Sequence, residues 1–237
     1  MAVARIVALA LLALPAAPSR AQEADAGMRG YVTLATGYWR HGLEQNDGAT
    51  LELGFDYEHP TGAFVGAATR NLEYPLEYSV YRPREHETDV YAGFHRRTNA
   101  WSLTLSVGRY LFGGAAASYD YPEASVAFGV RDRVFYTVTY SGDFYGRGRT
   151  AFGQEASAVL PLPFDAEIGA AIGTFEVRNR MRHTYWDLGV SKLLGRFAVD
   201  LRYYDGGYGT PTALGDAGGT HVVASVSYAL RKRRVKI

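Results

Sequence analysis

The stretch Trp101–Val107 reads WSLTLSV and alternates apolar residues with small hydroxyl residues along its whole length. Successive side chains of a β-strand point to opposite faces, so the apolar residues would share one face and the hydroxyls the other. The stretch therefore predicts a strand with one apolar and one polar surface.

The same alternation recurs between turn-forming residues along the rest of the chain. Clear strands are predicted at Leu51–Tyr57, Ala124–Val130, Val134–Tyr140, Phe164–Ile172, Trp186–Val190, Phe197–Tyr203 and Val222–Leu230. Weaker strands are predicted at Tyr31–Trp39, Ala63–Arg70, Thr88–Arg96 and Phe152–Leu160, which brings the total to twelve. High contents of Tyr (18) and Gly (27) also favour an all-β chain.

The predicted connections alternate between short and long. Short turns are expected at 58–62, 97–99, 131–133, 161–163 and 194–196. Longer loops are expected at 40–48, 71–87, 112–119, 142–150, 176–183 and 205–219. This alternation is typical of an even-stranded membrane barrel with both termini at the periplasmic rim. The loop 71–87, which contains several Tyr and Pro residues, would either fold inward as a constriction or form an exposed tip.

The predicted apolar faces carry no charge at their central positions, as a lipid-facing surface requires. A Lys or Arg facing lipid at the bilayer midplane costs about 2–4 kcal/mol, and the cost falls toward zero at the interfaces. Arg109 is the one exception by parity, and it lies toward the loop end of its strand. Aromatic residues near strand ends are expected to form interfacial girdles: Tyr31, Trp39, Tyr57, Trp101, Tyr110, Tyr140, Trp186 and Tyr203.

The N-terminus has the three-part plan of a secretory signal. Arg5 supplies a positive charge, an apolar run follows from Ile6 to Ala17, and Ser19-Arg20-Ala21 offers a plausible cleavage site. We therefore predict three parts: a cleaved signal peptide at 1–21, a single antiparallel up-and-down transmembrane β-barrel of about 12 strands at 22–230, and a basic C-terminal tail at 231–237. Such a chain would reside in a bacterial outer membrane.

Composition excludes several other classes of protein. The chain has no cysteine, so neither a disulfide framework nor a cysteine metal site can form. Its 25 Lys and Arg residues nearly balance 24 Asp and Glu residues, which gives no reason to expect nucleic acid as a partner. No cofactor or metal site is expected. Mean hydropathy is −0.15, a value compatible with strands that alternate apolar and polar residues.

The segment 37–62 resembles the opening of the TorF family of porins, also called the Gcw_chp family. The matching residues are Tyr38, Arg40, Gly42, Gln45, Asp47, Gly54, Asp56, Tyr57, His59 and Gly62. The later stretch Glu87–Gly93 resembles the next strand of that family, and His41 stands between the Arg and Gly that the family's turn joins. The resemblance implies an outer-membrane barrel that acts as a porin for an undefined solute.

Strand parity also predicts which polar residues line the lumen. The candidates are Glu52, Asp56, Asp89, His95, Glu123, Arg131, Glu155, Asp165, Glu167, Asp187, Asp200 and Arg202. Most are carboxylates, so an open lumen would be mildly acidic and would favour cations or neutral polar solutes. Alternatively, these acids pair with arginines and merely fill the interior.

These observations predict a porin-like channel for passive diffusion of small polar solutes, with no enzymatic activity. Its expected partners are outer-membrane lipid, the barrel assembly machinery and the solutes themselves. Two alternatives are a structural or adhesive barrel without an open pore and an outer-membrane lipid hydrolase. The hydrolase needs a nucleophile and a base within reach of each other, and the chain has no Gly-x-Ser-x-Gly motif.

Overall fold

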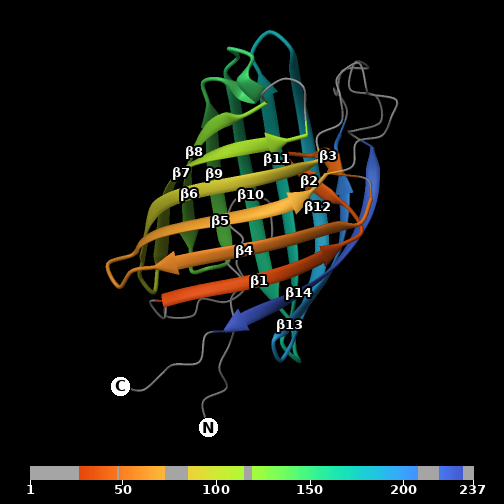
Figure 1. The fold of residues 1–237 in the computed structure, drawn as a ribbon. Coiled ribbons are helices and arrows are strands. Elements are labelled where there is room, and N and C mark those ends of the chain that lie inside the picture. The colour runs from red at the N-terminus through yellow and green to blue at the C-terminus, as the bar shows by residue number, and fades with distance from the viewer. Residues whose placement is uncertain (1–26, 47, 73–84, 115–118, 208–218, 232–237) are drawn as a thin grey trace.

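The computed structural model describes residues 27–46, 48–72, 85–114, 119–207 and 219–231 (Figure 1). The predicted signal peptide, most of the loop 71–87 and the basic tail beyond residue 231 lie outside the described residues. Among the residues that are described, no helix has the length and apolar character needed to cross a membrane.

Twelve antiparallel strands close into a barrel, as the sequence predicts (Figure 1). They are β1 (Gly27–Ala35), β4 (Thr50–Glu58), β5 (Ala63–Asn71), β6 (His86–Arg97), β7 (Trp101–Gly113), β8 (Tyr121–Val130), β9 (Val134–Ser141), β10 (Ala151–Pro161), β11 (Ala166–Val177), β12 (Met181–Leu194), β13 (Phe197–Asp205) and β14 (Thr220–Arg231). From β4 to β14 each strand pairs with the next one in the chain, and β1 closes the barrel by pairing with both β4 and β14.

Two further strands form a separate hairpin between β1 and β4, namely β2 (Tyr38–Arg40) and β3 (Leu43–Asn46). A short 3-10 turn, η2 (Phe144–Gly146), lies in the connection between β9 and β10. The predicted strand 31–39 therefore ends early, at Ala35, because the chain leaves the barrel wall before it reaches Tyr38.

Side chains alternate between the two surfaces of the wall. In β4, Leu51 and Phe55 are 45% and 57% exposed on the outside, whereas Glu52 and Asp56 are buried inside. Each of the twelve barrel strands carries large, exposed apolar residues of this kind, and they lie at its outward positions. A polar interior inside an apolar exterior reverses the arrangement of a water-soluble protein and suits a barrel surrounded by lipid.

One connection that was predicted to be long is short in the structure. Residues 176–183 were expected to form a long loop, but β11 and β12 continue almost to its middle and leave a turn at 178–180. The pairs Phe175↔His183 and Val177↔Met181 extend the ladder, and Asn179 takes a positive φ of 60° in the turn. At the opposite rim, Phe164 belongs to a turn with a φ of 63° instead of opening β11.

The predicted aromatic girdles are correct only in part. Tyr57, Tyr140, Trp186 and Tyr203 are exposed on the outer surface, and Trp101 is half-buried. Tyr31, Trp39 and Tyr110 are buried instead, with exposed fractions of 7%, 1% and 1%. For Tyr31 and Tyr110 the cause is parity, since their strand positions face the lumen; Trp39 lies in the separate hairpin.

Candidate functional site

Most of the loop predicted at 40–48 lies inside the barrel, at the centre of the lumen. Its residues 38–46 make the β2–β3 hairpin, here called the lumen hairpin, which turns at His41 and Gly42 with φ values of 53° and 72°. Tyr38, Trp39 and Arg40 are almost completely buried. A three-residue strand with no exposed face must be surrounded by the barrel wall, and the contacts of the hairpin show which strands surround it.

One side of the lumen hairpin contacts β5 to β8. The Arg40 guanidinium pairs with Glu87 at 3.2 Å and lies 4.3 Å from the centroid of the Tyr110 ring. The Tyr38 hydroxyl donates to Glu87 at 3.3 Å, and the Arg70 guanidinium lies 4.7 Å from the Tyr38 ring. Burial raises the pKa of Tyr38 well above its ordinary value, so its hydroxyl remains a donor at any physiological pH.

The opposite side contacts β13 and β14. Trp39 stacks on Tyr204, with ring centroids 5.6 Å apart, and meets the ring of His221 at 4.7 Å. Glu44 lies 3.4 Å from the Nδ1 atom of His221. These contacts place the His221 ring against the hairpin, where it helps to hold it.

The tip of the hairpin is fitted between β8, β11 and β12. The His41 ring lies parallel to that of Phe175 at 4.6 Å, and His183 Nε2 donates to the His41 carbonyl at 2.6 Å. A Cβ atom on Gly42 would lie 2.3 Å from the Cβ of Tyr185, so no side chain fits there. The hairpin therefore spans the lumen from one wall to the other.

A compact ion network lies where the hairpin meets β4, β5 and β6. Arg70 binds Glu52 at 2.7 Å and Asp89 at 2.8 Å, and it also pairs with Glu87. All four side chains are at most 10% exposed. With Arg40 included, two arginines share three carboxylates, and charge-assisted hydrogen bonds of this kind hold buried charges in fixed positions.

A second network joins β12 and β13. Arg202 pairs with Asp187 and contacts Asp200 at 3.3 Å, while the Ser191 hydroxyl donates to Asp200 at 2.5 Å. Asp187 is 1% exposed at its side chain, but Asp200 is 25% exposed. Because Asp200 faces the interior, that exposed carboxylate is open to the lumen.

Three other inward carboxylates accept a hydrogen bond from a tyrosine. Tyr91 donates to Asp56, Tyr110 donates to Glu123 at 3.2 Å, and Tyr185 donates to Glu155 at 3.0 Å. A neutral hydroxyl orients a carboxylate without neutralising its charge. Glu123 also lies 3.8 Å from the Nε2 atom of His41, and Asp56 and Glu123 are only 9% and 7% exposed.

The remaining inward positions of β7 to β10 and β14 carry mainly small residues, and several of these are Ser or Thr. Ser106 and Ser125 share a hydrogen bond of 2.6 Å across β7 and β8, and Ser227 bonds Thr33 at 2.8 Å where β14 meets β1. Ser106, Ser125 and Ser227 are half-buried, so the interior beside them is not completely filled by side chains.

Ten of the twelve predicted lumen residues lie on barrel strands at inward positions. They are Glu52, Asp56, Asp89, His95, Glu123, Glu155, Glu167, Asp187, Asp200 and Arg202. The structure places Arg131 and Asp165 elsewhere, in exposed turns at 131–133 and 162–165 with φ values of 50° and 56°. Positive φ bends the chain away from the strand there, so strand parity does not apply to them.

Sequence reasoning missed Arg40, Arg70 and Glu87, the core of the network under the hairpin. Glu87 shares its parity with Asp89, so a prediction that extended its strand by one residue would have found it. The described part of the chain contains no group of three or more His, Cys, Asp or Glu side chains arranged to hold a metal ion.

A family model described as "Bacterial protein of unknown function (Gcw_chp)" matches residues 21–230. No curated protein matches the sequence. Several solved porin structures share the fold. The KdgM porin has 11% identity and a TM-score of 0.55, covering 86% of this chain and 99% of its own.

Two further solved structures are similar to the same degree. The NanC porin has 8% identity and a TM-score of 0.53, covering 87% of this chain and 100% of its own. The outer membrane protein Omp33 of Acinetobacter baumannii has 9% identity and a TM-score of 0.50, covering 88% of this chain and 100% of its own. At such low identities these likenesses establish the fold alone.

Proposed function

The chain belongs to the Gcw_chp family of bacterial proteins of unknown function, and for this member we propose the function of a narrow outer-membrane channel for passive diffusion of small polar solutes. The observation that carries the proposal is the lumen itself, which combines charged groups and half-buried hydroxyls inside an apolar exterior. A barrel that served only as a scaffold would have no need of inward charges that remain in contact with solvent, such as Asp200 at 25% exposure.

The lumen hairpin supports a narrow pore in preference to a wide one. Twelve strands lie between the eight-stranded barrels that side chains fill and the 16- to 18-stranded porins with a broad aqueous channel. The hairpin occupies part of that interior and contacts both walls. The space that remains lies beside the small residues of β7 to β10, where Ser106 and Ser125 are half-buried.

The charge of the lumen supports a preference for cations or neutral solutes. Arg70, Arg40 and Arg202 are each engaged with carboxylates, whereas Asp56, Glu123 and Glu155 are held by tyrosine hydroxyls. Fixed negative charge in a low-dielectric pore raises the local concentration of cations. In this proposal the acids paired with arginines fill part of the interior, and the acids held by tyrosines contribute the charge that a solute would meet.

Several finer features belong to the same proposal. We also propose that the chain is a TorF-type porin, that a signal peptide at 1–21 directs its export, and that the barrel assembly machinery inserts it into the outer membrane. The five turns at 59–62, 98–100, 131–133, 162–165 and 195–196 would then face the periplasm, together with the start of β1 and the end of β14.

A structural barrel without an open pore is the second candidate. It is favoured by the lumen hairpin and by Tyr145 of η2, which donates to Gln45 at 3.0 Å and so covers the hairpin from the extracellular loops. If the hairpin and this cover closed the lumen completely, no solute would pass.

Single-channel recording in planar bilayers tests the proposal. The refolded protein is expected to give small, uniform conductance steps, and a KCl gradient is expected to give a reversal potential of the cation-selective sign. Replacement of the three tyrosine-bound acids (Asp56→Asn, Glu123→Gln, Glu155→Gln) is expected to weaken that selectivity. A folded protein, identified by heat-modifiable migration in gels, that gave no conductance would overturn the channel in favour of the structural barrel.

A further inference from the structure

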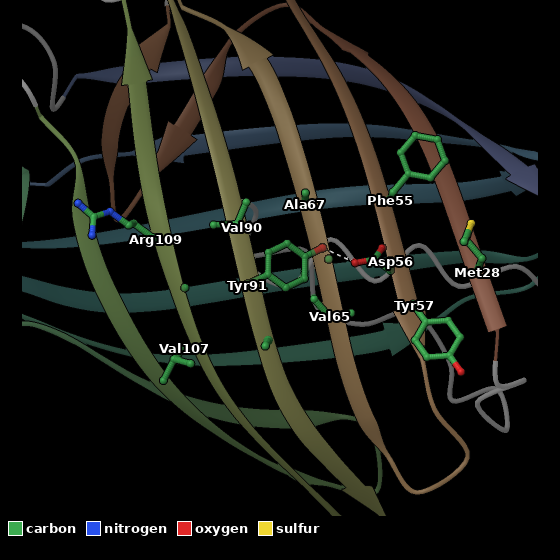
Figure 2. A pocket seen from close by; sticks show the side chains of 13 residues that line it. Met28, Phe55, Asp56, Tyr57, Val65, Ala67, Val90, Tyr91, Val107 and Arg109 are labelled. Atoms are coloured by element: carbon green, nitrogen blue, oxygen red, sulfur yellow. Dashed lines mark hydrogen bonds between the residues drawn. The ribbon is translucent and has the colours of Figure 1, made fainter.

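The outer wall of the barrel is hollowed over β4, β5, β6 and β7 (Figure 2). The groove has a volume of about 760 Å³. It forms because Ala67 and Ala92 alternate with the bulkier Phe55, Val65, Val90 and Val107 on neighbouring strands. Phe55, Val65 and Val107 are 57%, 52% and 62% exposed, so the groove opens to the surroundings of the barrel and not to its lumen.

A hydrogen bond lies beneath the floor of the groove, on the lumen side of the wall. In this bond Tyr91 donates to Asp56 across β5 (Figure 2). A Cβ on Gly66 would lie 2.5 Å from both residues, so a glycine is needed between them. The wall is thus closely packed on its lumen side, while the depression itself comes from the small side chains of Ala67 and Ala92 on the outer side.

One arginine lies at the end of this apolar groove. Arg109 occupies an outward, exposed position on β7 and pairs with Val90 on β6 and Pro122 on β8. It has no ion-pair partner within the described residues. The strand runs from the turn at 98–100 toward the opposite rim and ends at Gly113, so Arg109 belongs to the half of the wall that faces the outside of the cell in the orientation proposed above.

An unpaired guanidinium on a lipid-facing surface is unfavourable unless it reaches the interface or meets an anion. A phosphate accepts two parallel hydrogen bonds from a guanidinium, and the apolar groove beside it would bury a hydrocarbon chain. The lipid that carries both groups in the outer leaflet of a bacterial outer membrane is lipid A, the phosphorylated acyl glycolipid of lipopolysaccharide.

We propose that the groove and Arg109 form a binding site for one lipid A molecule, with an acyl chain along Ala67 and Ala92 and a phosphate on Arg109. The site rests on the proposed outer-membrane location and orientation, but it does not depend on the pore being open. The lipid-binding test and the conductance test can therefore give independent results.

Native mass spectrometry of the full folded protein in detergent tests the site, with bis-phosphorylated lipid A titrated against phosphatidylethanolamine. Wild-type protein is expected to retain one lipid A at concentrations where phosphatidylethanolamine leaves no adduct. Arg109→Gln, which removes the phosphate partner, is expected to weaken lipid A binding roughly tenfold. Ala92→Leu, which fills the groove, is expected to weaken it in the same direction.

Arg96→Gln is the matched control, because Arg96 is also exposed and outward but lies near the other end of its strand, β6. It is expected to bind lipid A as wild type does. The proposal is overturned if Arg109→Gln and Arg96→Gln bind lipid A equally, or if phosphatidylethanolamine binds as tightly as lipid A. Heat-modifiable migration verifies that each variant is folded. Loss of conductance with lipid A binding intact would contradict the channel and leave this site standing.

Discussion

The ion networks around Arg70 and Arg202 are built alike, with one arginine shared between carboxylates, but they lie in different parts of the lumen and differ in what covers them. In each, one arginine binds carboxylates on its own or neighbouring strands. The lumen hairpin covers Arg70, whose partners Glu87 and Asp89 have side chains at most 3% exposed. The Arg202 network keeps Asp200 at 25% exposure.

The difference separates a structural role from a functional one. A covered ion network cannot meet a solute, and its charges depend entirely on each other for stabilisation. A network with an exposed carboxylate keeps part of its charge available to the lumen. The first network therefore positions the hairpin, while the second contributes to the charge that a solute encounters.

The largest expected effect comes from breaking the covered network. Arg70→Met leaves Glu52, Glu87 and Asp89 without their shared partner in a buried site, and such a loss costs about 3–5 kcal/mol. Urea unfolding of the refolded protein in lipid vesicles, followed by tryptophan fluorescence, measures it. Arg202→Met is the comparison and is expected to cost less, because Asp200 already reaches solvent. Equal losses for the two variants would show that the hairpin does not distinguish the networks.

A smaller effect is expected at the tip of the hairpin, which connects the two walls. Gly42→Ala places a Cβ 2.3 Å from that of Tyr185 and should displace the tip, at a cost of about 1–3 kcal/mol. Single-channel conductance is expected to rise as the hairpin moves out of the lumen.

Gly195→Ala separates displacement from backbone strain. Gly195 also has a positive φ, 68°, but a Cβ there would meet no atom within 4 Å. It is expected to lower stability slightly and to leave conductance unchanged. If both variants changed conductance alike, the contact with Tyr185 would not be what holds the hairpin in place.

Asp200→Asn, which changes the exposed carboxylate itself, is expected to have the smallest effect on stability, below about 1 kcal/mol. The substitution keeps the shape of the side chain and its contact with Ser191. The measurable change is a reversal potential in a KCl gradient that moves toward zero. Asp165→Asn removes the same charge from an exposed turn and is expected to leave the potential as it was. A shift of similar size in both would mean that Asp200 acts only through the net charge of the protein.

The barrel wall could be predicted from sequence because each strand carries its own period-two signal. WSLTLSV already orients β7, and the same parity places Tyr110 inside, although its position near a strand end suggested a girdle. Residues 176–183 were expected to form a loop, yet their alternation continues the strands.

The lumen hairpin could not be predicted in the same way. Residues 38–46 are too short to show a period, and their partners, from Arg70 to His221, are distant in the sequence. What makes Arg40 a lumen residue is a tertiary contact with Glu87, and no local pattern encodes it. Only the turn itself was signalled, by Gly42.

The position of the lumen hairpin in the chain also constrains the order of assembly. The hairpin lies between β1 and β4, whereas the seam that closes the barrel joins β1 to β14. Its contacts with Phe175, His183, Tyr204 and His221 come from strands that join last in chain order. The barrel therefore has to close around the lumen hairpin. If the hairpin were still outside when β1 pairs with β14, the closed wall would prevent it from entering, and the chain would be misfolded.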